Sequence, residues 1–416
     1  MESTANSVLG FPMNESDVII AGGGPVGLAL ALELSKAGVA VTVFEAQRDR
    51  SLVPAGIMGS RSLNQASGLL LHRLGVLGGI RERALWWFDP QVTSLPIPGT
   101  GHPLIEGFVG HFANIGLKAR NIDPVGLGDP GFGGGAVAMA DVVGVLEAAA
   151  VQAGASIRMG AQVTDFIEDA TGVTVTTATG RARARWLVAC DGGRSLLRKR
   201  AGIGFPGTDA EFIARVAFVT FATDEKLDVG GWVETARGSY IHSPAGRLHV
   251  VEYGAAQGER EAPVSLDEIA ASFERVAGRS VRLERLLLGQ RYTDAARQVE
   301  AYRKGRLLMA GDAARIHSPA GGQGLNQGLG DAAALGRLLP PVLRGEAPIV
   351  SLDAYDAERR PVGDAILDWT RAQSALGRPD PNTRALRRVV ADLLDSKHGA
   401  TYVLRRVGGD WTKAAS

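Results

Sequence analysis

The chain has 416 residues, of which 45% are hydrophobic, and a formal net charge of +1 at pH 7. This length allows two domains or one elaborate domain, with enough apolar material for a large core. The near-zero charge gives no reason to expect nucleic acid or an acidic membrane surface as a partner. No apolar run reaches transmembrane length, and residues 1–16 lack the basic start and apolar core of a signal peptide. We therefore expect a soluble cytoplasmic protein.

Cysteine and histidine usage argues against a metal centre or a redox pair. Cys190 is the single cysteine, so the chain has neither an internal disulfide nor a C-x-x-C pair. Its 7 histidines are scattered, without an H-E-x-x-H motif or companion thiolates. We expect no metal site.

The stretch from residue 17 to residue 45 has the pattern of a β-α-β unit. The apolar run at 18–21 predicts a buried strand, 28–36 predicts a helix, and 39–44 predicts a second strand. Between the first strand and the helix stands G-x-G-x-x-G, which indicates dinucleotide binding when it occurs in this context. The candidate binding residues of this unit are Gly22, Gly24, Pro25, Gly27 and Glu45.

These residues have distinct physical tasks. Gly22 allows the tight turn, Gly24 lets a pyrophosphate approach the backbone, and Gly27 lets the helix lie close to the strand. The helix N-terminus offers free N–H groups and a partial positive charge to the phosphates. Glu45 is placed to bond the ribose hydroxyls of an adenosine. The motif alone does not separate FAD from NAD.

The next segment, up to residue 153, is less regular. A glycine-containing loop carries Arg61, which fits a contact with a charged ligand and equally fits a solvated surface arginine. Helices are predicted at 63–77 and at 141–153, the second capped by Asp141. Residues 86–135 are rich in Gly, Pro and isolated aromatic residues, which is typical of a binding region or of short strands in a substrate domain.

From residue 156 the pattern becomes β. A buried strand at 183–190 ends in Asp191-Gly192 and runs into a segment that contains Arg198. Such an ending places a carboxylate and backbone donors at the ligand-binding edge of a sheet, although a plain Asp-Gly turn has the same sequence. Residues 205–293 alternate as an antiparallel sheet with a helix at 265–276, and such sheets often form the wall of a substrate cavity.

A second glycine-rich turn lies between a strand at 306–310 and a helix at 325–339. Asp312, at the strand end, can accept hydrogen bonds from a polyol such as a ribityl chain. The glycines admit a flat ring, and the helix N-terminus would stabilise negative charge on a reduced flavin. A simple glycine-rich turn is the alternative. Two nucleotide-like sites so far apart favour one long cofactor, FAD, over NAD; the candidates here are Asp312, Pro319, Gly322, Gly324, Leu325 and Asn326.

Taken in order, the motifs resemble those of the single-component aromatic hydroxylases, flavoprotein monooxygenases similar to para-hydroxybenzoate hydroxylase. The motifs are Gly22-x-Gly24-x-x-Gly27 with Glu45, Asp191-Gly192-x-x-Ser195-x-x-Arg198, and Gly311-Asp312 with residues 319–326. The chain is most similar to the hydroxylases of bacterial aromatic polyketide biosynthesis, on residues 110–113 and 355–363.

The resemblance implies an α/β fold: a Rossmann-like FAD-binding domain with an inserted antiparallel-sheet substrate domain and a C-terminal helical segment. We expect the FAD-binding domain to comprise residues 1–85, 136–204 and 294–370. The substrate domain would comprise 86–135 and 205–293. Residues 371–416 would form a helical tail, without the thioredoxin-like third domain that many relatives carry.

The resemblance also implies an activity. FAD would be reduced by NADPH or NADH, react with O2 and hydroxylate a polycyclic, polyketide-type phenol through a flavin C4a-hydroperoxide. Alternatives are a Baeyer–Villiger or other oxidation on the same scaffold, or a flavin-binding accessory protein without turnover. The aromatic small molecule would be the partner, and the chain would be a monomer or homodimer. No catalytic base can be named from the sequence.

By the same resemblance, the first motif and Glu45 would hold the ADP part, Asp312 the ribityl chain, and residues 324–326 the flavin ring. Asp191 and Arg198 would serve the FAD pyrophosphate and the nicotinamide cofactor. Three positions depart from the family pattern. An arginine that often precedes Gly56 is missing, with Arg61 as its candidate replacement; Met139 stands in place of a glutamine; and Arg315 stands in place of a histidine.

Overall fold

The computed structural model describes residues 16–55, 59–88, 108–123, 125, 133–223, 225, 227–243, 246–254 and 262–411. Within these residues, eight strands form a mixed sheet whose main path runs β19-β20-β11-β1-β2-β8. Its strands are β1 (Ser16–Ala21), β2 (Val41–Phe44), β8 (Ser156–Arg158), β9 (Val163–Glu168), β10 (Val173–Thr177), β11 (Gly180–Ala189), β19 (Arg303–Lys304) and β20 (Leu307–Met309).

The centre of this sheet is parallel. β1 pairs in parallel with β2 and β11, β2 pairs with β8, and β11 pairs with β20. Val18, Ile19 and Ile20 are fully buried, as expected for a strand that is covered on both faces. Because parallel strands end at the same edge, the turns after β1, β11 and β20 come together there.

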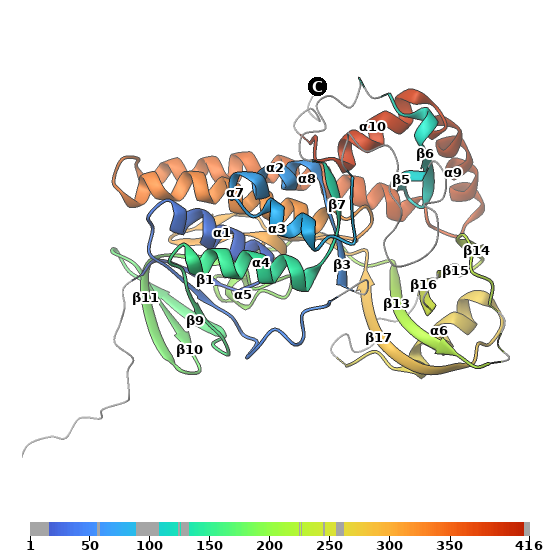
Figure 1. The fold of residues 1–416 in the computed structure, drawn as a ribbon, viewed down its shortest axis with the longest axis horizontal. Coiled ribbons are helices and arrows are strands. Elements are labelled where there is room, and N and C mark those ends of the chain that lie inside the picture. The colour runs from blue at the N-terminus through green and yellow to red at the C-terminus, as the bar shows by residue number, and fades with distance from the viewer. Residues whose placement is uncertain are drawn as a thin grey trace, which may run out of the picture.

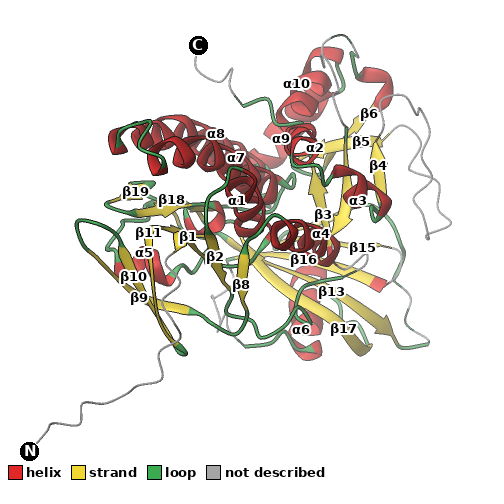
Figure 2. Cartoon of the chain, turned by 60° about the vertical axis from the view of Figure 1, so that its left-hand side comes forward, coloured by secondary structure: helices red, strands yellow, loops and turns green. Residues whose placement is uncertain are grey.

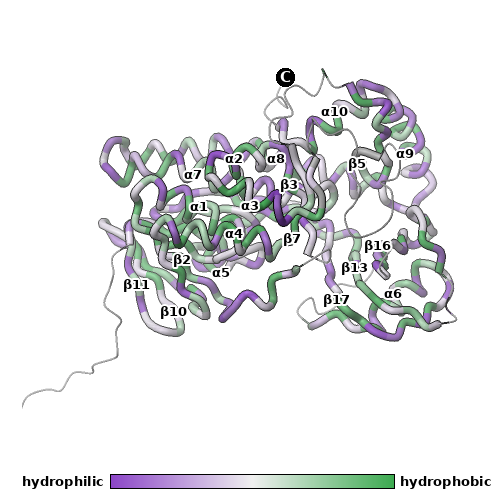
Figure 3. Tube along the Cα trace, viewed as in Figure 1, coloured by the Kyte–Doolittle hydropathy of each residue, from purple (hydrophilic) through white to green (hydrophobic). Residues whose placement is uncertain are grey.

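Helices α1 (Pro25–Lys36), α4 (Met139–Gln152) and α7 (Gln323–Leu343) cover one face of the sheet (Figure 1). Figure 2 shows the antiparallel pair β9–β10, which continues the sheet from β11, and the short helix α5 (Leu196–Arg200) beside this pair. Hydrophobic residues line α1 and α4, where these helices enter the main core (Figure 3).

A second, antiparallel sheet has the order β14-β15-β16-β13-β17. The strands are β13 (Phe212–Phe221), β14 (Val233–Thr235), β15 (Gly238–Ser243), β16 (Arg247–Tyr253) and β17 (Leu283–Thr293). Helix α6 (Leu266–Ala277) packs Ile269 and Phe273 against Leu248 and Val250 of β16, and so covers one face of this sheet (Figure 1). The antiparallel sheet that the alternating pattern predicted is present.

Smaller elements complete the fold. The small sheets contain β3 (Ser60–Leu63), β4 (Trp86–Phe88), β5 (Phe108–Phe112), β6 (Ile115–Lys118), β7 (Gly134–Ala138), β12 (Gly207–Thr208), β18 (Ala296–Gln298) and β21 (Arg315–Ile316). The other helices are α2 (Gln65–Arg73), α3 (Leu77–Glu82), α8 (Asp353–Ala375), α9 (Pro381–Leu394), α10 (Lys397–Val407) and the 3-10 turns η2 (Ala119–Asn121), η4 (Gly311–Ala313) and η5 (Ile349–Leu352). In the part of the chain that the structure describes, no helix is long and apolar enough to cross a membrane.

Two predicted helices differ from the observed ones. The helix predicted at 63–77 is divided into the end of β3, α2 and the start of α3. Asn64 caps α2 by accepting a hydrogen bond from the Ser67 amide, and Gly75 leaves the helical region with φ +79°. The other helix begins at Met139 rather than at Asp141 and has no side-chain cap. Asp141 instead lies in its first turn, where a carboxylate is favourable to the helix dipole.

Candidate cofactor site

The turn between β1 and α1 requires glycine at two positions for steric reasons. Gly22 has φ +111°, and a Cβ added to it would lie 2.2 Å from the carbonyl oxygen of Cys190. A Cβ at Gly27 would lie 2.1 Å from the Gly22 carbonyl oxygen, so the helix could not approach the strand. Pro25 is the first residue of α1, a position that needs no backbone donor.

Gly24 differs from these two glycines because a Cβ added to it would meet no protein atom within 4 Å. Its side-chain direction therefore points into open space directly before the first turn of α1. Backbone N–H groups in a first helical turn have no partner within the helix. The turn thus combines unobstructed access with free donors, which is the arrangement that binds a phosphate group.

Glu45 follows β2 and lies beside the same turn. Its Oε2 accepts a hydrogen bond of 2.7 Å from the Gly23 amide, and its Oε1 accepts one of 2.8 Å from the Gln47 amide. Arg50 lies 3.7 Å from the carboxylate. These contacts fix Glu45 against the turn between β1 and α1, with carboxylate lone pairs left for hydroxyl donors.

Asp312 lies after β20, in the turn η4, and its carboxylate accepts no hydrogen bond from any described residue. Desolvation by the surrounding protein raises the pKa of Asp312, although its side chain is accessible to solvent. A polyol would supply the missing donors.

The glycine-rich turn before α7 adjoins Asp312. A Cβ at Gly324 would lie 3.9 Å from the Asp312 Oδ1 and from the His317 ring, so this glycine faces both side chains. Gly322 is the N-cap residue of α7 and has φ +66°. Its amide donates a hydrogen bond to the carbonyl of Pro319, and Pro319 is an exposed residue. Leu325 is half-buried and packs against the main core.

Asn326 joins three elements through its side-chain amide. Its Oδ1 accepts hydrogen bonds from the Asn64 amide and the Ser67 hydroxyl, at 2.8 Å and 2.6 Å. Its Nδ2 donates to the carbonyls of Ser62 and Gly322, at 2.9 Å and 2.7 Å. The Asn326 side chain therefore ties the start of α7 to β3 and α2, and its contact with a flavin ring stays a prediction.

Asp191 and Arg198 hold the turn after β11. Asp191 Oδ2 accepts from the Leu196 and Leu197 amides, at 2.8 Å and 3.2 Å, while its Oδ1 is buried and has no partner among the described residues. Arg198 donates to the carbonyls of Ala313 and Gly193, at 2.9 Å and 3.0 Å. Arg198 thus connects the turn after β11 to the turn after β20. Its predicted contacts with phosphates or nicotinamide stay predictions.

Arg61 lies on β3, close to the start of α7. Its Nη1 donates to the Ser60 carbonyl at 2.8 Å, and desolvation lowers its pKa. The side chain is half-buried, which agrees better with an enclosed position than with a fully solvated surface arginine. Gly56, the glycine that an arginine often precedes in the family, lies outside the described residues.

A buried ion network behind the Asp312 turn was missed in the sequence. Asp331 of α7 is fully buried and accepts from the Gly311 amide at 2.9 Å. Its two oxygens also pair with Arg315 and Arg359, each at 2.8 Å. Arg315, noted only as a departure from a histidine, is therefore one cation of a network that supports the Asp312 turn.

The three motif turns converge. A Cβ at Gly311 would lie 3.3 Å from Val26 of the first motif, and one at Gly328 would lie 2.4 Å from it. Open space at Gly24 fits a pyrophosphate, and the free carboxylate of Asp312 fits a ribityl chain. The buried, unpartnered Oδ1 of Asp191 adds an acceptor beside them. The residues present therefore fit FAD.

A cationic cleft of about 680 Å³ lies between the turn after β11 and the five-stranded sheet. Its charged lining residues comprise six cations and one carboxylate, namely Arg194, Arg198, Lys199, Arg215, Arg291, Arg297 and Glu268. This excess of positive charge favours an anionic ligand.

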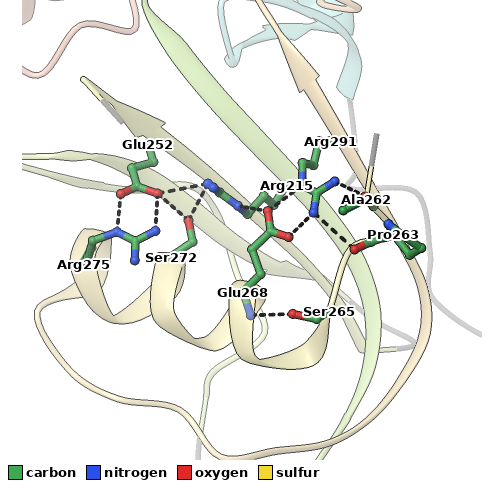
Figure 4. Close-up of polar contacts among 9 residues, drawn as sticks. All are labelled: Arg215, Glu252, Ala262, Pro263, Ser265, Glu268, Ser272, Arg275 and Arg291. Atoms are coloured by element: carbon green, nitrogen blue, oxygen red, sulfur yellow. Dashed lines mark hydrogen bonds and ion pairs between the residues drawn. The ribbon is translucent and has the colours of Figure 1, made fainter. Parts of the chain in front are cut away.

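One wall of the cleft belongs to a network on the face of the sheet that α6 covers. We call it the α6-face network; it consists of Arg215, Glu252, Glu268, Ser272, Arg275 and Arg291 (Figure 4). Arg215 links its two carboxylates, because it donates to Glu252 at 3.0 Å and to Glu268 at 2.8 Å. The network fixes the direction of the guanidinium groups at the cleft.

The stability of the protein should fall in acid partly through Glu268. Hydrogen bonds from Arg291 are the main cause that lowers the pKa of Glu268 to about 2, against about 4.3 in an unfolded chain. A lowered folded-state pKa stabilises the fold above the unfolded pKa, and this stabilisation, at most about 3 kcal/mol, is lost as the pH falls toward 2. The urea concentration at the unfolding midpoint should therefore fall less between about pH 6 and about pH 3 in Glu268→Gln than in the wild type. Equal differences would contradict this assignment.

The sequence profile of the "FAD binding domain" family matches residues 15–93 and 109–370. A monooxygenase of Claviceps purpurea is 35% identical over 401 residues, which cover 95% of this chain and 76% of that protein. The 12-dehydrotetracycline 5-monooxygenase/anhydrotetracycline 6-monooxygenase of Streptomyces rimosus is 35% identical over 403 residues, or 91% of this chain and 73% of that protein. A Diels-Alderase of pyrroindomycin biosynthesis has a similar structure, with a TM-score of 0.80 and 32% identity over 95% of this chain and 80% of that one.

These likenesses extend over nearly the whole chain and include both sheets. They confirm the expected fold class and the resemblance that the motifs indicated. The chain belongs to the FAD-binding family of para-hydroxybenzoate hydroxylase-like aromatic monooxygenases.

Proposed function

We propose that this protein is an FAD-dependent, NAD(P)H-consuming monooxygenase that hydroxylates a polycyclic aromatic phenol. The turns after β1, β11 and β20 converge, and no described residue donates a hydrogen bond to the Asp312 carboxylate; these observations carry the proposal. We also propose the domain division given above, in which residues 205–293 supply the substrate sheet.

The tasks of the chain in this reaction are binding and positioning. Bound FAD supplies electron transfer from the nicotinamide cofactor and activation of O2. The turn at Gly24 and the first turn of α1 would hold the pyrophosphate, Glu45 the adenosine ribose, and Asp312 the ribityl chain. The free N–H groups at the start of α7 would stabilise negative charge on the flavin ring.

The electron donor is the next part of the proposal. The cationic cleft supports NAD(P)H binding, because its charge and its volume of about 680 Å³ suit a dinucleotide with two or three phosphates. It adjoins Arg198, which holds the turns of the FAD site together. Electrons would thus enter from the side of the sheet edge where the three motif turns meet.

Replacing Lys199 with glutamine should weaken NADPH binding. Lys199 is exposed and lines the cleft, whereas Arg200, the next residue, is also exposed and does not line it. We expect the KM for NADPH to rise about fivefold in Lys199→Gln, which corresponds to a loss of about 1 kcal/mol in binding free energy. The KM of the variant should also depend less on salt concentration than that of the wild type. Arg200→Gln is the matched control, and an equal change in both variants would argue against the cleft.

A polycyclic substrate is supported by the relatives. The Streptomyces rimosus protein is named for anhydrotetracycline, a fused-ring phenol. Aromatic side chains, among them Phe212, Tyr253 and Tyr292, form a cluster on the face of the five-stranded sheet opposite α6. Aromatic side chains in such a position suit flat ring systems.

The test begins with the absorbance spectrum of purified protein, followed by NADPH oxidation in air with a panel of polycyclic phenols. We expect flavin bands, oxidation stimulated by one of the phenols, and a product that is heavier by one oxygen atom. A colourless protein that takes up no added FAD would refute the proposal, and so would flavoprotein that oxidises NADPH with none of these aromatics.

A second candidate is ring formation without net oxidation. The similar structure of a Diels-Alderase favours it. Product mass separates the two candidates, because a cycloaddition leaves the mass unchanged and consumes no NADPH. A Baeyer–Villiger oxidation would also add one oxygen atom, and the position of that atom in the product distinguishes it from hydroxylation.

A further inference from the structure

The two faces of the five-stranded sheet hold their arginines differently. On the face that α6 covers, each arginine of the α6-face network is paired with a carboxylate (Figure 4). Arg247 lies on the opposite face, because side chains alternate along β16 and Leu248 packs against α6. No carboxylate among the described residues forms an ion pair with Arg247, and its guanidinium donates no hydrogen bond to them.

The Arg247 side chain is exposed to solvent, and desolvation by the protein beside it nevertheless lowers the pKa of its guanidinium. Two polar side chains on the same face are close enough to respond to its charge. Burial, aided by the charge of Arg247, lowers the pKa of His249 to about 3, so His249 is neutral at physiological pH. Burial raises the pKa of Tyr292, and the charge of Arg247 opposes that rise.

His249 and Tyr292 are held together across β13. His249 Nε2 and the Tyr292 hydroxyl share a hydrogen bond of 2.8 Å, across the strand that carries Ala214. Trp232 packs edge-on against His249, with ring centroids 4.8 Å apart. An unpaired cation therefore stands beside a fixed aromatic and polar surface.

This face of the sheet is linked to the glycine-rich turn before α7. Tyr253, on the same face of β16, donates to the Ser374 carbonyl at the end of α8, at 2.9 Å. The neighbouring Gln373 donates to the carbonyl of Ala320 at 3.5 Å. The end of α8 thus contacts both the sheet face and the turn assigned to the flavin.

We propose that Arg247, together with Trp232 and the His249–Tyr292 pair, forms an anion-binding subsite for an ionised phenol or enol of a polycyclic substrate. The inference rests on the proposed function, since it places the substrate of that reaction. Arg247 supplies a permanent cation to the oxyanion, and the aromatic side chains contact the ring that carries it. The O–H proton is lost to solvent, because neutral His249 with its low pKa is a poor acceptor.

The charged groups around Tyr253 are paired or lie at the other end of this face. Glu211, Asp294 and Arg378 surround Tyr253, at the far end of β16 from Arg247. Arg378 forms an ion pair with Glu211, and Asp294 accepts from the amides of Glu211 and Phe212. Arg247 is therefore the cation that would contact a substrate anion at the start of β16.

The test measures binding of alizarin, a dihydroxyanthraquinone, and of its dimethyl ether, which cannot ionise, to the FAD-loaded protein. At a pH where alizarin is ionised, the wild type should prefer alizarin to the ether. Arg247→Gln should bind the alizarin anion at least about tenfold more weakly and the ether equally well. Arg247→Lys should retain part of the preference. Arg285→Gln, an exposed arginine of β17, is the control and should behave as the wild type.

The visible absorption of bound alizarin gives a second readout, because the anion and the neutral phenol differ in colour. The apparent pKa of bound alizarin should be lower than in water with the wild type and not with Arg247→Gln. The same preference in wild type and Arg247→Gln would overturn the proposal, and so would the absence of saturable alizarin binding to the wild type. Arg247-dependent binding without turnover of any phenol would instead refute the proposed reaction and leave the subsite standing.

Discussion

Asp331→Asn is expected to lower the free energy of unfolding by about 3–5 kcal/mol. Asp331 is fully buried and pairs with two arginines that are themselves at most 10% exposed in their side chains. The neutral amide would leave Arg315 and Arg359 without a counter-charge in a region that water does not reach. Asparagine is nearly isosteric, so the expected loss comes from charge and not from a cavity.

Chemical denaturation of the apoprotein measures this loss, and the chain offers a matched control. Arg337 and Glu358 form an ion pair between the same two helices, α7 and α8, but their side chains are 58% and 42% exposed. Glu358→Gln should therefore cost less than about 1 kcal/mol, as is usual for exposed pairs. If Asp331→Asn cost no more than Glu358→Gln, the buried network would not stabilise the fold.

Gly24→Ala should separate cofactor binding from folding. A Cβ at Gly24 meets no protein atom within 4 Å, and its φ of −73° is open to any residue. The apoprotein should therefore unfold at nearly the wild-type denaturant concentration. The methyl group would occupy the approach of the pyrophosphate, and by analogy with overpacked sites we expect about 10- to 100-fold weaker FAD binding.

Titration of apoprotein with FAD, followed by flavin fluorescence, measures the affinity of the Gly24 variant. Gly144→Ala in α4 is the control, because a Cβ there also meets no protein atom but lies far along the chain from the three motifs. It should bind FAD as the wild type does. Unchanged FAD affinity in Gly24→Ala would place the pyrophosphate elsewhere.

The turns proposed to bind the cofactor were predictable as turns because their signals are local. Gly22 and Gly27 are required by contacts with atoms that are near in sequence or on an adjacent strand, and the apolar run before them marks the strand. The alternation in residues 205–293 likewise identified the second sheet, since one of its faces packs against α6. The helix predicted at 63–77 was too long, because the apolar spacing in the sequence continues across the turn that Gly75 forms.

Contacts between distant segments were decided by the tertiary structure. Asp331, Arg315 and Arg359 carry no local pattern, yet burial without water makes their mutual pairing obligatory. Asn326 was predicted to contact the flavin ring from its place in a motif, but the structure also places its amide between β3, α2 and α7. Among the described residues Arg247 has no carboxylate partner, because sheet pairing brings Glu252 and Glu268 to the face that α6 covers. The sequence by itself thus indicated which turns have the form expected of a dinucleotide site, through short-range steric rules. The packing of distant strands and helices decided which charges are paired and which are left for a ligand.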